Sequence, residues 1–128
     1  KYEKAITVYA DRERVQQVLT NLIMNSIKYG KKKGTTEVSV QPIFENKIIV
    51  RVRDNGEGIE EEHLPRLFER FYRVDKSGNR RRGGSGLGLA IVKHIIEAHK
   101  EQIFVESQPE IGSEFSFTLE KSELIEAL

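Results

Sequence analysis

The stretch KIIVRVRDNGEGI, residues 47–59, indicates both the architecture of the protein and the place of a site within it. Its first part alternates with a period of two residues, which predicts a strand whose buried face carries Ile48, Val50 and Val52. By the same parity Asp54 points to the apolar side. An ionised carboxylate is costly there unless a partner or a ligand uses it.

Hydrophobic spacing on either side of this stretch predicts the remaining elements. Asp11 is placed to cap a helix whose apolar residues recur at helical spacing as far as Gly30, a C-cap signal. The predicted helices cover residues 11–29, 65–71 and 87–99, and the predicted strands cover residues 5–9, 37–44, 47–54, 102–107 and 113–120. Pro42 places its strand at an edge or beside a bulge. This order predicts an α+β fold, a two-layer α/β sandwich in which a mixed, mostly antiparallel sheet has helices on one face.

Length and composition are those of one domain with one core. The chain has 128 residues, 38% of them hydrophobic, and a net charge of +1, so we expect a single domain over residues 1–128. The balanced charge argues against a domain built to neutralise nucleic-acid phosphates. Cysteine is absent, which excludes disulfides and thiolate chemistry and favours a reducing compartment. Because Lys1 opens the chain without a signal peptide or a membrane-spanning run, we expect a soluble piece of a longer protein.

Three polar residues of the first predicted helix, Asn21, Asn25 and Lys28, fall on one stripe beside its apolar face. The amide oxygen of asparagine is a neutral, hard ligand that suits a Mg²⁺ ion already carrying phosphate and water. Lys28 follows within reach of a phosphate. Taken alone, the stripe is better explained as a solvated helix face, so its assignment depends on the other motifs.

The motif DNGEGI, residues 54–59, directly follows the buried strand. Gly56 and Gly58 would let the backbone pass close to a flat ligand. A carboxylate at Asp54 would accept a hydrogen bond from the N6 amino group of adenine and repel the O6 atom of guanine. The alternative is an ordinary tight turn, because Asn-Gly is a common turn pair.

A glycine-rich run, GGSGLGL at residues 83–89, stands directly before the last predicted helix. Backbone N–H groups at a helix start attract anions, and the helix dipole adds to that attraction. The run lacks the lysine of a P-loop, where Gly84 stands, and the third glycine of a dinucleotide fingerprint, where Ile91 stands. It is therefore a phosphate loop of another kind or a flexible hinge. Residues 74–85 have almost no apolar side chains, which predicts a lid, a binding loop or a disordered segment.

The three histidines, His63, His94 and His99, show no metal-ligand spacing and no acidic residue directly after them. Histidines in such settings are more often surface or packing residues than ligands or nucleophiles. We therefore expect them to have structural roles.

In their order and spacing, four segments resemble the motifs of sensor histidine kinases. Residues 21–29 (NLIMNSIKY) resemble the N box, residues 54–59 the first glycine box, residues 68–73 (FERFYR) the F box and residues 84–89 (GSGLGL) the second glycine box. The chain is thus similar to the catalytic ATP-binding domain of a two-component sensor kinase, and within that family to the phosphate-regulon subgroup. The family belongs to the GHKL superfamily with gyrase, Hsp90 and MutL, which implies the Bergerat ATP-binding fold.

The resemblance implies a role for each matching position in binding ATP and Mg²⁺. Asn25, assisted by Asn21, would ligate Mg²⁺, while Lys28 and Arg73 would contact the phosphates and complete the catalytic set with Asn25. Tyr29 would pack near the nucleotide, and the implied contacts around the base are Asp54, Gly56, Gly58 and Ile59. The implied contacts around the phosphates are Gly84, Ser85, Gly86, Leu87, Gly88 and Leu89, beside an ATP lid at about residues 74–85.

One position favours phosphoryl transfer over hydrolysis. In the hydrolases of the superfamily, a glutamate one helical turn before the Mg²⁺ asparagine acts as the base for water. That position is Asn21 here, which cannot take a proton at neutral pH. The resemblance therefore implies transfer of the ATP γ-phosphoryl group to an external histidine and onward to a response regulator aspartate.

The sequence also departs from the family pattern. Lys100 and Glu101 stand where Gly-Gly often follows the histidine, and the Gly-x-Gly before the last strand is reduced to Glu110-Ile111-Gly112. Ser26 replaces the commoner alanine and is small enough to fit.

The acceptor histidine and the dimerisation hairpin of the family are missing from residues 1–128, as is a sensor domain. We therefore expect this chain alone to bind ATP as a monomer without phosphorylating itself. Its partner would be the histidine-containing dimerisation domain of a homodimeric parent, anchored at the cytoplasmic face of the bacterial inner membrane, with no nucleic acid involved. The alternative is a GHKL-type ATPase, a serine kinase or a regulatory nucleotide-binding module.

Overall fold

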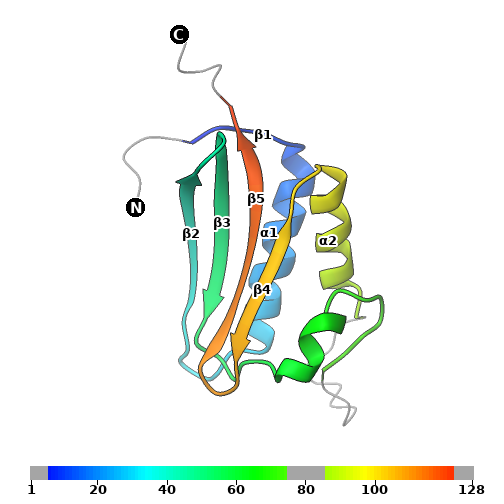
Figure 1. Cartoon of the computed structure of the whole chain (residues 1–128). Helices are drawn as coiled ribbons and strands as arrows, with labels where there is room; N and C mark the ends of the chain where they lie inside the picture. The colour runs from blue at the N-terminus through cyan, green and yellow to red at the C-terminus, as the bar shows by residue number, and fades with distance from the viewer. Residues whose placement is uncertain (1–5, 75–85, 123–128) are drawn as a thin grey trace.

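In the part of the chain that the structure describes, two α-helices cover one face of an antiparallel sheet of five strands (Figure 1). The structure, a computed structural model, describes residues 6–74 and 86–122. The elements in chain order are β1 (Val8–Tyr9), α1 (Arg12–Lys28), β2 (Thr36–Ile43), β3 (Lys47–Asp54), the 3-10 helix η1 (Glu61–Arg66), α2 (Gly88–Ala98), β4 (Ile103–Gln108) and β5 (Gly112–Lys121). This architecture confirms the predicted α+β two-layer sandwich, and every pairing between the described strands is antiparallel.

β5 is the central strand of the sheet. One of its edges pairs with β3 along the whole of β3. Its other edge pairs with β4 through residues 112–117 and with β1 through residues 120–121. β2 lies outermost and pairs with β3 without interruption, so Pro42 lies in an edge strand, as predicted, and causes no bulge.

α1 begins at its predicted cap. The Asp11 Oδ1 atom accepts hydrogen bonds from the backbone N–H groups of Glu13 (3.1 Å) and Arg14 (3.2 Å), which satisfies two donors that a helix start leaves open. The predicted helix limits are therefore confirmed to within one residue. The buried residues of α1 are Val18, Leu22 and Ser26.

The helix predicted over residues 65–71 is wrong, because the structure has η1 at Glu61–Arg66 instead. Pro65 lies near the end of η1 and lacks the N–H group that a continuing helix would need. Beyond it the chain turns, and the ring of Phe68 meets the ring of Phe115 edge-on at 6.2 Å between centroids. Phe71 has a φ of 66°, which a right-handed helix does not contain. The strand predicted at residues 5–9 is also shorter, since only Val8–Tyr9 pairs with β5.

One core lies between the two layers. α1 and α2 contribute one side of it, and the inward residues of β3 and β5 contribute the other. Its most deeply buried large side chains are Phe117, Leu22, Ile96, Val18, Val52 and Val92. Within residues 6–74 and 86–122, no helix has both the length and the apolar character that crossing a bilayer requires.

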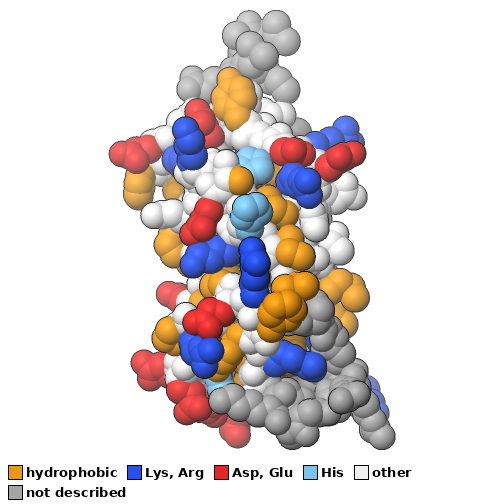
Figure 2. Space-filling model, turned by 90° about the vertical axis from the view of Figure 1, so that its right-hand side faces the viewer, with side chains coloured by type: hydrophobic (Ala, Val, Ile, Leu, Met, Phe, Trp, Pro, Cys, Tyr) orange, Lys and Arg blue, Asp and Glu red, His pale blue; other side chains and the backbone are white. Residues whose placement is uncertain are grey.

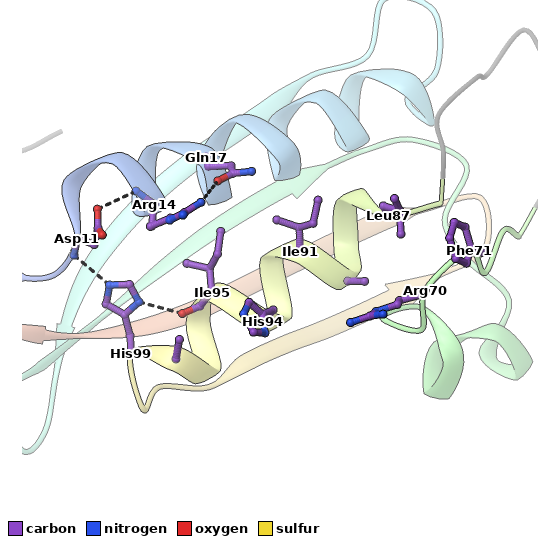
Figure 3. A pocket seen from close by; sticks show the side chains of 12 residues that line it. Asp11, Arg14, Gln17, Arg70, Phe71, Leu87, Ile91, His94, Ile95 and His99 are labelled. Atoms are coloured by element: carbon purple, nitrogen blue, oxygen red, sulfur yellow. Dashed lines mark hydrogen bonds between the residues drawn. The ribbon is translucent and has the colours of Figure 1, made fainter.

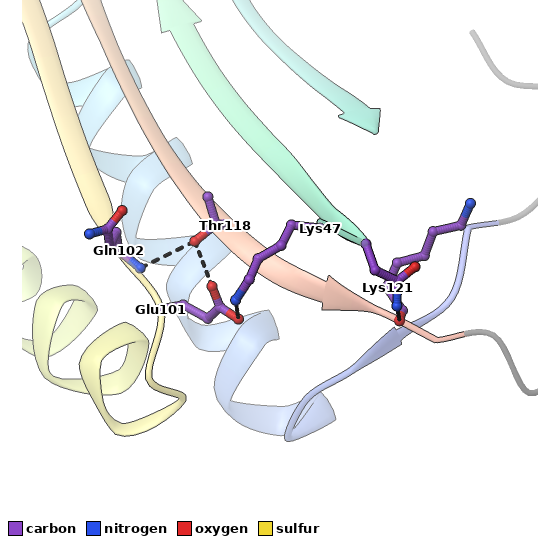
Figure 4. A network of polar contacts seen from close by, with 6 residues as sticks. Lys47, Glu101, Gln102, Thr118 and Lys121 are labelled. Carbon is purple, nitrogen blue, oxygen red and sulfur yellow. Dashed lines mark hydrogen bonds and ion pairs between the residues drawn. The ribbon is translucent and has the colours of Figure 1, made fainter. Parts of the chain in front are cut away.

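A polar network holds the turn between α2 and β4 (Figure 4). Lys100 adopts a φ of 62°, the left-handed conformation that glycine takes at lower cost. Glu101 is buried, and its carboxylate accepts hydrogen bonds from Lys47 Nζ (2.7 Å) and Thr118 Oγ1 (2.7 Å). The two residues that stand in place of the glycines thus keep a glycine-like turn and bind it to β3 and β5.

Candidate functional site

The described site residues gather at one end of the sandwich, where α1 and β3 end and α2 begins (Figure 1). Gly56 lies against the end of α1, since a Cβ atom on it would be only 2.7 Å from the Tyr29 carbonyl oxygen. Asn21 on α1 donates a hydrogen bond from Nδ2 to the Gly88 carbonyl at the start of α2 (3.3 Å). The fold therefore brings together three motifs that are far apart in the sequence.

Asp54 is half-buried at the end of β3. Its Oδ1 atom accepts a 2.9 Å hydrogen bond from the N–H group of Gly56. No described residue hydrogen-bonds Oδ2, and no buried side-chain oxygen or nitrogen in the described ranges lacks a partner, so Oδ2 is open to solvent. One carboxylate oxygen is thus fixed by the protein, while the other is left to accept a hydrogen bond from a ligand.

The DNGEGI loop is braced from behind by the turn between β4 and β5. The Ile59 N–H group donates to Ser107 Oγ (2.8 Å), and the Glu110 N–H group donates to the Glu57 carbonyl (2.6 Å). Gly58 has a φ of 74° and approaches the β4 backbone so closely that a side chain would collide with it. The loop is therefore held by distant strands and is not the ordinary tight turn considered from the sequence.

Gly112 and Ser107 also support the DNGEGI loop, and neither was identified from the sequence as part of the site. Gly112 has a φ of 146°, and a Cβ atom on it would collide with the backbone of Asp54. Ser107 Oγ donates to the Gly112 carbonyl (3.0 Å) while it accepts from the DNGEGI loop. The single glycine before the last predicted strand was the available signal for Gly112, whereas no pattern marked Ser107.

The polar stripe on α1 lies as its spacing predicts, with Asn21 and Asn25 half-buried and Lys28 exposed. Because the Asn21 amide nitrogen donates its hydrogen bond to the Gly88 carbonyl, the amide oxygen is the atom left to bind a cation. The described part of the chain has no group of three or more His, Cys, Asp or Glu side chains able to hold a metal ion. A Mg²⁺ ion would therefore depend on amide oxygens together with phosphate, a donor set that suits it.

The second glycine-rich segment is described from Gly86 onward. Leu87 precedes α2 without a side-chain hydrogen bond to the helix start. The start of a helix attracts anions through its N–H groups and its dipole. Gly88 has open space where a side chain would be, whereas Leu89 packs against the core. The predictions that lie outside the described residues are those for Gly84, Ser85 and the lid at residues 75–85.

The three histidines lie at packed or exposed positions in the structure. His63 is buried and hydrogen-bonds Tyr72 Oη through Nδ1. His99 accepts a hydrogen bond at Nε2 from the Asp11 N–H group (3.0 Å) and donates from Nδ1 to a carbonyl one turn earlier in α2 (2.9 Å). His94 is exposed on α2.

A groove of about 940 Å³ runs between α1 and α2 (Figure 3). Among the predicted site residues that the structure describes, only Leu87 lines it, so it is distinct from the site around Asp54 and Asn25. On the side of the molecule that carries α2, basic, acidic and hydrophobic side chains are intermingled (Figure 2). The groove is lined by Asp11, Arg14, Gln17, Arg70, Phe71, Leu87, Ala90, Ile91, His94, Ile95, Ala98 and His99.

Known proteins are similar in sequence to this chain over most of its length. Residues 10–123 match the family described as "Histidine kinase-, DNA gyrase B-, and HSP90-like ATPase". The sensor histidine kinase YkoH of Bacillus subtilis (strain 168) is 43% identical over 111 residues, which cover 87% of this chain and 24% of YkoH. The sensor protein kinase WalK of Staphylococcus aureus is 40% identical over 119 residues, which cover 91% of this chain and 28% of WalK. The chain thus spans about a quarter of the length of these relatives.

Solved structures share the fold. The mycobacterial sensor histidine kinase MprB superposes with a TM-score of 0.79 and 28% identity, covering 91% of this chain and 78% of the MprB chain. Full-length ShkA in complex with AMPPNP superposes with a TM-score of 0.80 and 29% identity, covering 92% of this chain and 24% of the ShkA chain.

Proposed function

The chain belongs to the family of histidine kinase-, DNA gyrase B- and HSP90-like ATPases, and we propose that it binds ATP as the catalytic domain of a sensor histidine kinase and passes the γ-phosphoryl group to a histidine on a separate dimerisation domain. The relatives YkoH and WalK are named as sensor kinases, and the similar ShkA structure holds AMPPNP, an ATP analogue. Both facts support this assignment.

The observation that carries the proposal is that the two carboxylate oxygens of Asp54 have different surroundings. Its Oδ1 atom is held by the Gly56 N–H group, and Oδ2 is open at a half-buried position. An amino group such as N6 of adenine can donate to Oδ2, whereas the O6 atom of guanine would meet a second acceptor. The site should therefore prefer adenine to guanine nucleotides.

Residues of α1 and the F box would act on the phosphates. Lys28 and Arg73 would neutralise phosphate charge and align the triphosphate for attack. Asn25 and Asn21 would hold Mg²⁺ through their amide oxygens, and the bound ion would neutralise charge that develops on the phosphates. Because an Asn21 amide cannot act as a base for water, the attacking group must bring its own lone pair, as an imidazole nitrogen does.

The remaining partners follow from the proposed reaction. The histidine acceptor would lie on the dimerisation domain of a larger, homodimeric and membrane-anchored protein, and the phosphoryl group would pass from it to an aspartate of a response regulator. We place this domain on the cytoplasmic face of the membrane, where ATP is present.

Calorimetric titration of this chain with AMPPNP, with and without Mg²⁺, and with GMPPNP tests the proposal. We expect Mg²⁺-dependent binding of AMPPNP and at least about tenfold weaker binding of GMPPNP, the effect of one discriminating pair of hydrogen bonds. Failure to bind AMPPNP, or equal binding of the two analogues, would remove the basis for the assignment.

A further inference from the structure

His63 forms a hydrogen bond that is not needed to anchor its segment in the core. It lies on η1 with 8% of its surface exposed, and its Nδ1 atom hydrogen-bonds the Tyr72 hydroxyl. The neighbouring Leu67 is buried and Phe68 packs on Phe115, so the segment is anchored in the core without this hydrogen bond. The hydrogen bond of His63 therefore restricts the orientation of Tyr72 in a segment that Leu67 and Phe68 already anchor in the core.

Tyr72 is held on three sides. The hydroxyl contacts His63, the guanidinium of Arg66 lies over the ring at 4.6 Å from its centroid, and the backbone N–H group donates to the Glu69 carbonyl (3.2 Å). Glu69 in turn binds Arg66 through two hydrogen bonds of 3.0 and 3.1 Å and raises the pKa of that guanidinium, mainly through a hydrogen bond. Tyr72 is thus fixed in rotation as well as in position.

Phe71 and Arg73 flank Tyr72 in the chain, so the fixed position of Tyr72 also constrains their backbone. Phe71 has a left-handed backbone with a φ of 66°, a conformation that is strained for an aromatic residue and persists only when its neighbours hold it. On the other side is Arg73, which is half-buried and follows directly in the chain. Arg73 thus directly follows two anchored residues, Phe71 through its N–H hydrogen bond to the Gly86 carbonyl and Tyr72 through its hydrogen bond to His63.

We propose that His63 is a positioning residue of the nucleotide site, which acts through Tyr72 to orient Arg73 toward the phosphates of the nucleotide. This inference rests on the proposed function, because it needs a triphosphate for Arg73 to contact. It assigns His63 no contact with the nucleotide and no proton transfer. A purely structural His63 would affect stability alone, whereas a positioning His63 affects binding of the phosphates.

The test compares AMPPNP with adenosine as calorimetric probes, both in the presence of Mg²⁺. Tyr72→Phe removes only the hydroxyl and leaves the ring beneath Arg66, whereas His63→Leu removes both ring nitrogens, Nδ1 and the Nε2 atom that lies 3.8 Å from Glu62 Oε2. We expect each variant to weaken AMPPNP binding about 3- to 10-fold, the effect of one hydrogen bond, and adenosine binding less than about twofold. Because the two residues act as one unit, the double variant should be no weaker than either single variant.

His63→Asn provides the rescue, because an asparagine amide can place a polar atom near the position of Nδ1. It should restore AMPPNP affinity to within about twofold of the unsubstituted chain. Tyr9→Phe is the matched control, since Tyr9 is exposed on β1 at the other end of the sandwich. It should leave the affinities for both probes unchanged.

Three outcomes would overturn the inference. If Tyr72→Phe binds AMPPNP as the unsubstituted chain does, the hydrogen bond positions nothing. If AMPPNP and adenosine weaken equally while the melting temperature falls, the role of His63 is structural. If the unsubstituted chain itself fails to bind AMPPNP, the proposed function fails and this inference fails with it, a result that the variants alone cannot produce.

Discussion

The Phe71 N–H group donates a 2.8 Å hydrogen bond to the Gly86 carbonyl, which joins the F box to the segment that precedes α2. Gly86 has a φ of 79°, and a Cβ atom on it would lie 2.7 Å from the α-carbon of Phe71. Both the conformation and the close approach require glycine at this position.

Gly86→Ala should therefore lower the free energy of unfolding by about 1–2 kcal/mol from the backbone conformation alone, and further because the backbone of Phe71 cannot rotate away. Gly88→Ala is the matched control. Among the described residues, nothing beyond its own helix backbone and chain neighbours lies within 4 Å of a Cβ at Gly88, and the residue is helical, so stability should be unchanged or raised by up to about 1 kcal/mol. Urea unfolding of both variants measures the difference, and equal effects would refute the argument.

Asp54→Asn should change base preference while it preserves the fold. The asparagine oxygen can still accept from the Gly56 N–H group, and its NH₂ group then replaces Oδ2. That group would face the N6 donor of adenine but could donate to O6 of guanine. AMPPNP binding should weaken about 10- to 100-fold, the value of a hydrogen bond to a charged group, and the preference over GMPPNP should fall or reverse. An unchanged ratio in calorimetry would mean that the base binds elsewhere.

The ion pair between Lys47 and Glu101 should contribute to stability. Its atoms are 2.7 Å apart, and the Glu101 side chain is 6% exposed against 34% for Lys47. Lys47→Met leaves a buried carboxylate without its cation, at a cost of about 2–3 kcal/mol, below the usual value for a fully buried pair because Lys47 is partly exposed. Adding Glu101→Gln should recover part of the loss, since glutamine still accepts from Thr118.

Lys93→Met serves as the comparison for that measurement. Lys93 and Glu97 form an exposed pair at 4.0 Å on α2, which should contribute less than about 0.5 kcal/mol. The two lysine variants are compared by urea unfolding in the same buffer. A loss at Lys47 no larger than that at Lys93 would show that the buried network adds no stability.

This chain should not acquire phosphate from ATP on its own histidines. His63 is buried, both ring nitrogens of His99 are engaged, and the exposed His94 is followed by an isoleucine instead of an acidic residue. Incubation with γ-labelled ATP and Mg²⁺, followed by acid and base treatment of the filter-bound protein, measures this directly. Acid-labile label on the chain alone would identify one of these histidines as an acceptor.

The sequence predicted the layers and most element limits because periodicity reports them directly. Alternation in β3 and helical spacing in α1 each follow from burial on one face, which the residue types record. The helix at residues 65–71 failed for a tertiary reason. Pro65 looked like a helix start, but the chain must turn there to place Phe68 on Phe115, and that requirement comes from a strand about 50 residues away.

Within the candidate site, the residues proposed to face a ligand left clearer signals in the sequence than the residues that support them. The parity of the strand alone predicted an inward Asp54, and the structure has this residue half-buried with one oxygen open. Ser107 and the backbone of Glu110 support the same loop through hydrogen bonds whose partners are about 50 residues apart. No local pattern encodes such pairs. At Lys100, by contrast, a local pattern was informative: its left-handed φ occurs where the family pattern has glycine.

The position of β5 in the chain determines when this domain can form during synthesis. Of the strands that the structure describes, three pair with β5, yet β5 is the last of them to leave the ribosome. Until residues 112–121 have emerged, only the β2–β3 hairpin has its partner, and the apolar faces of both helices lack the surface that buries them. The nascent chain therefore exposes those faces to chaperones or to neighbouring chains until β5 has emerged, and the sheet of this domain is completed only then.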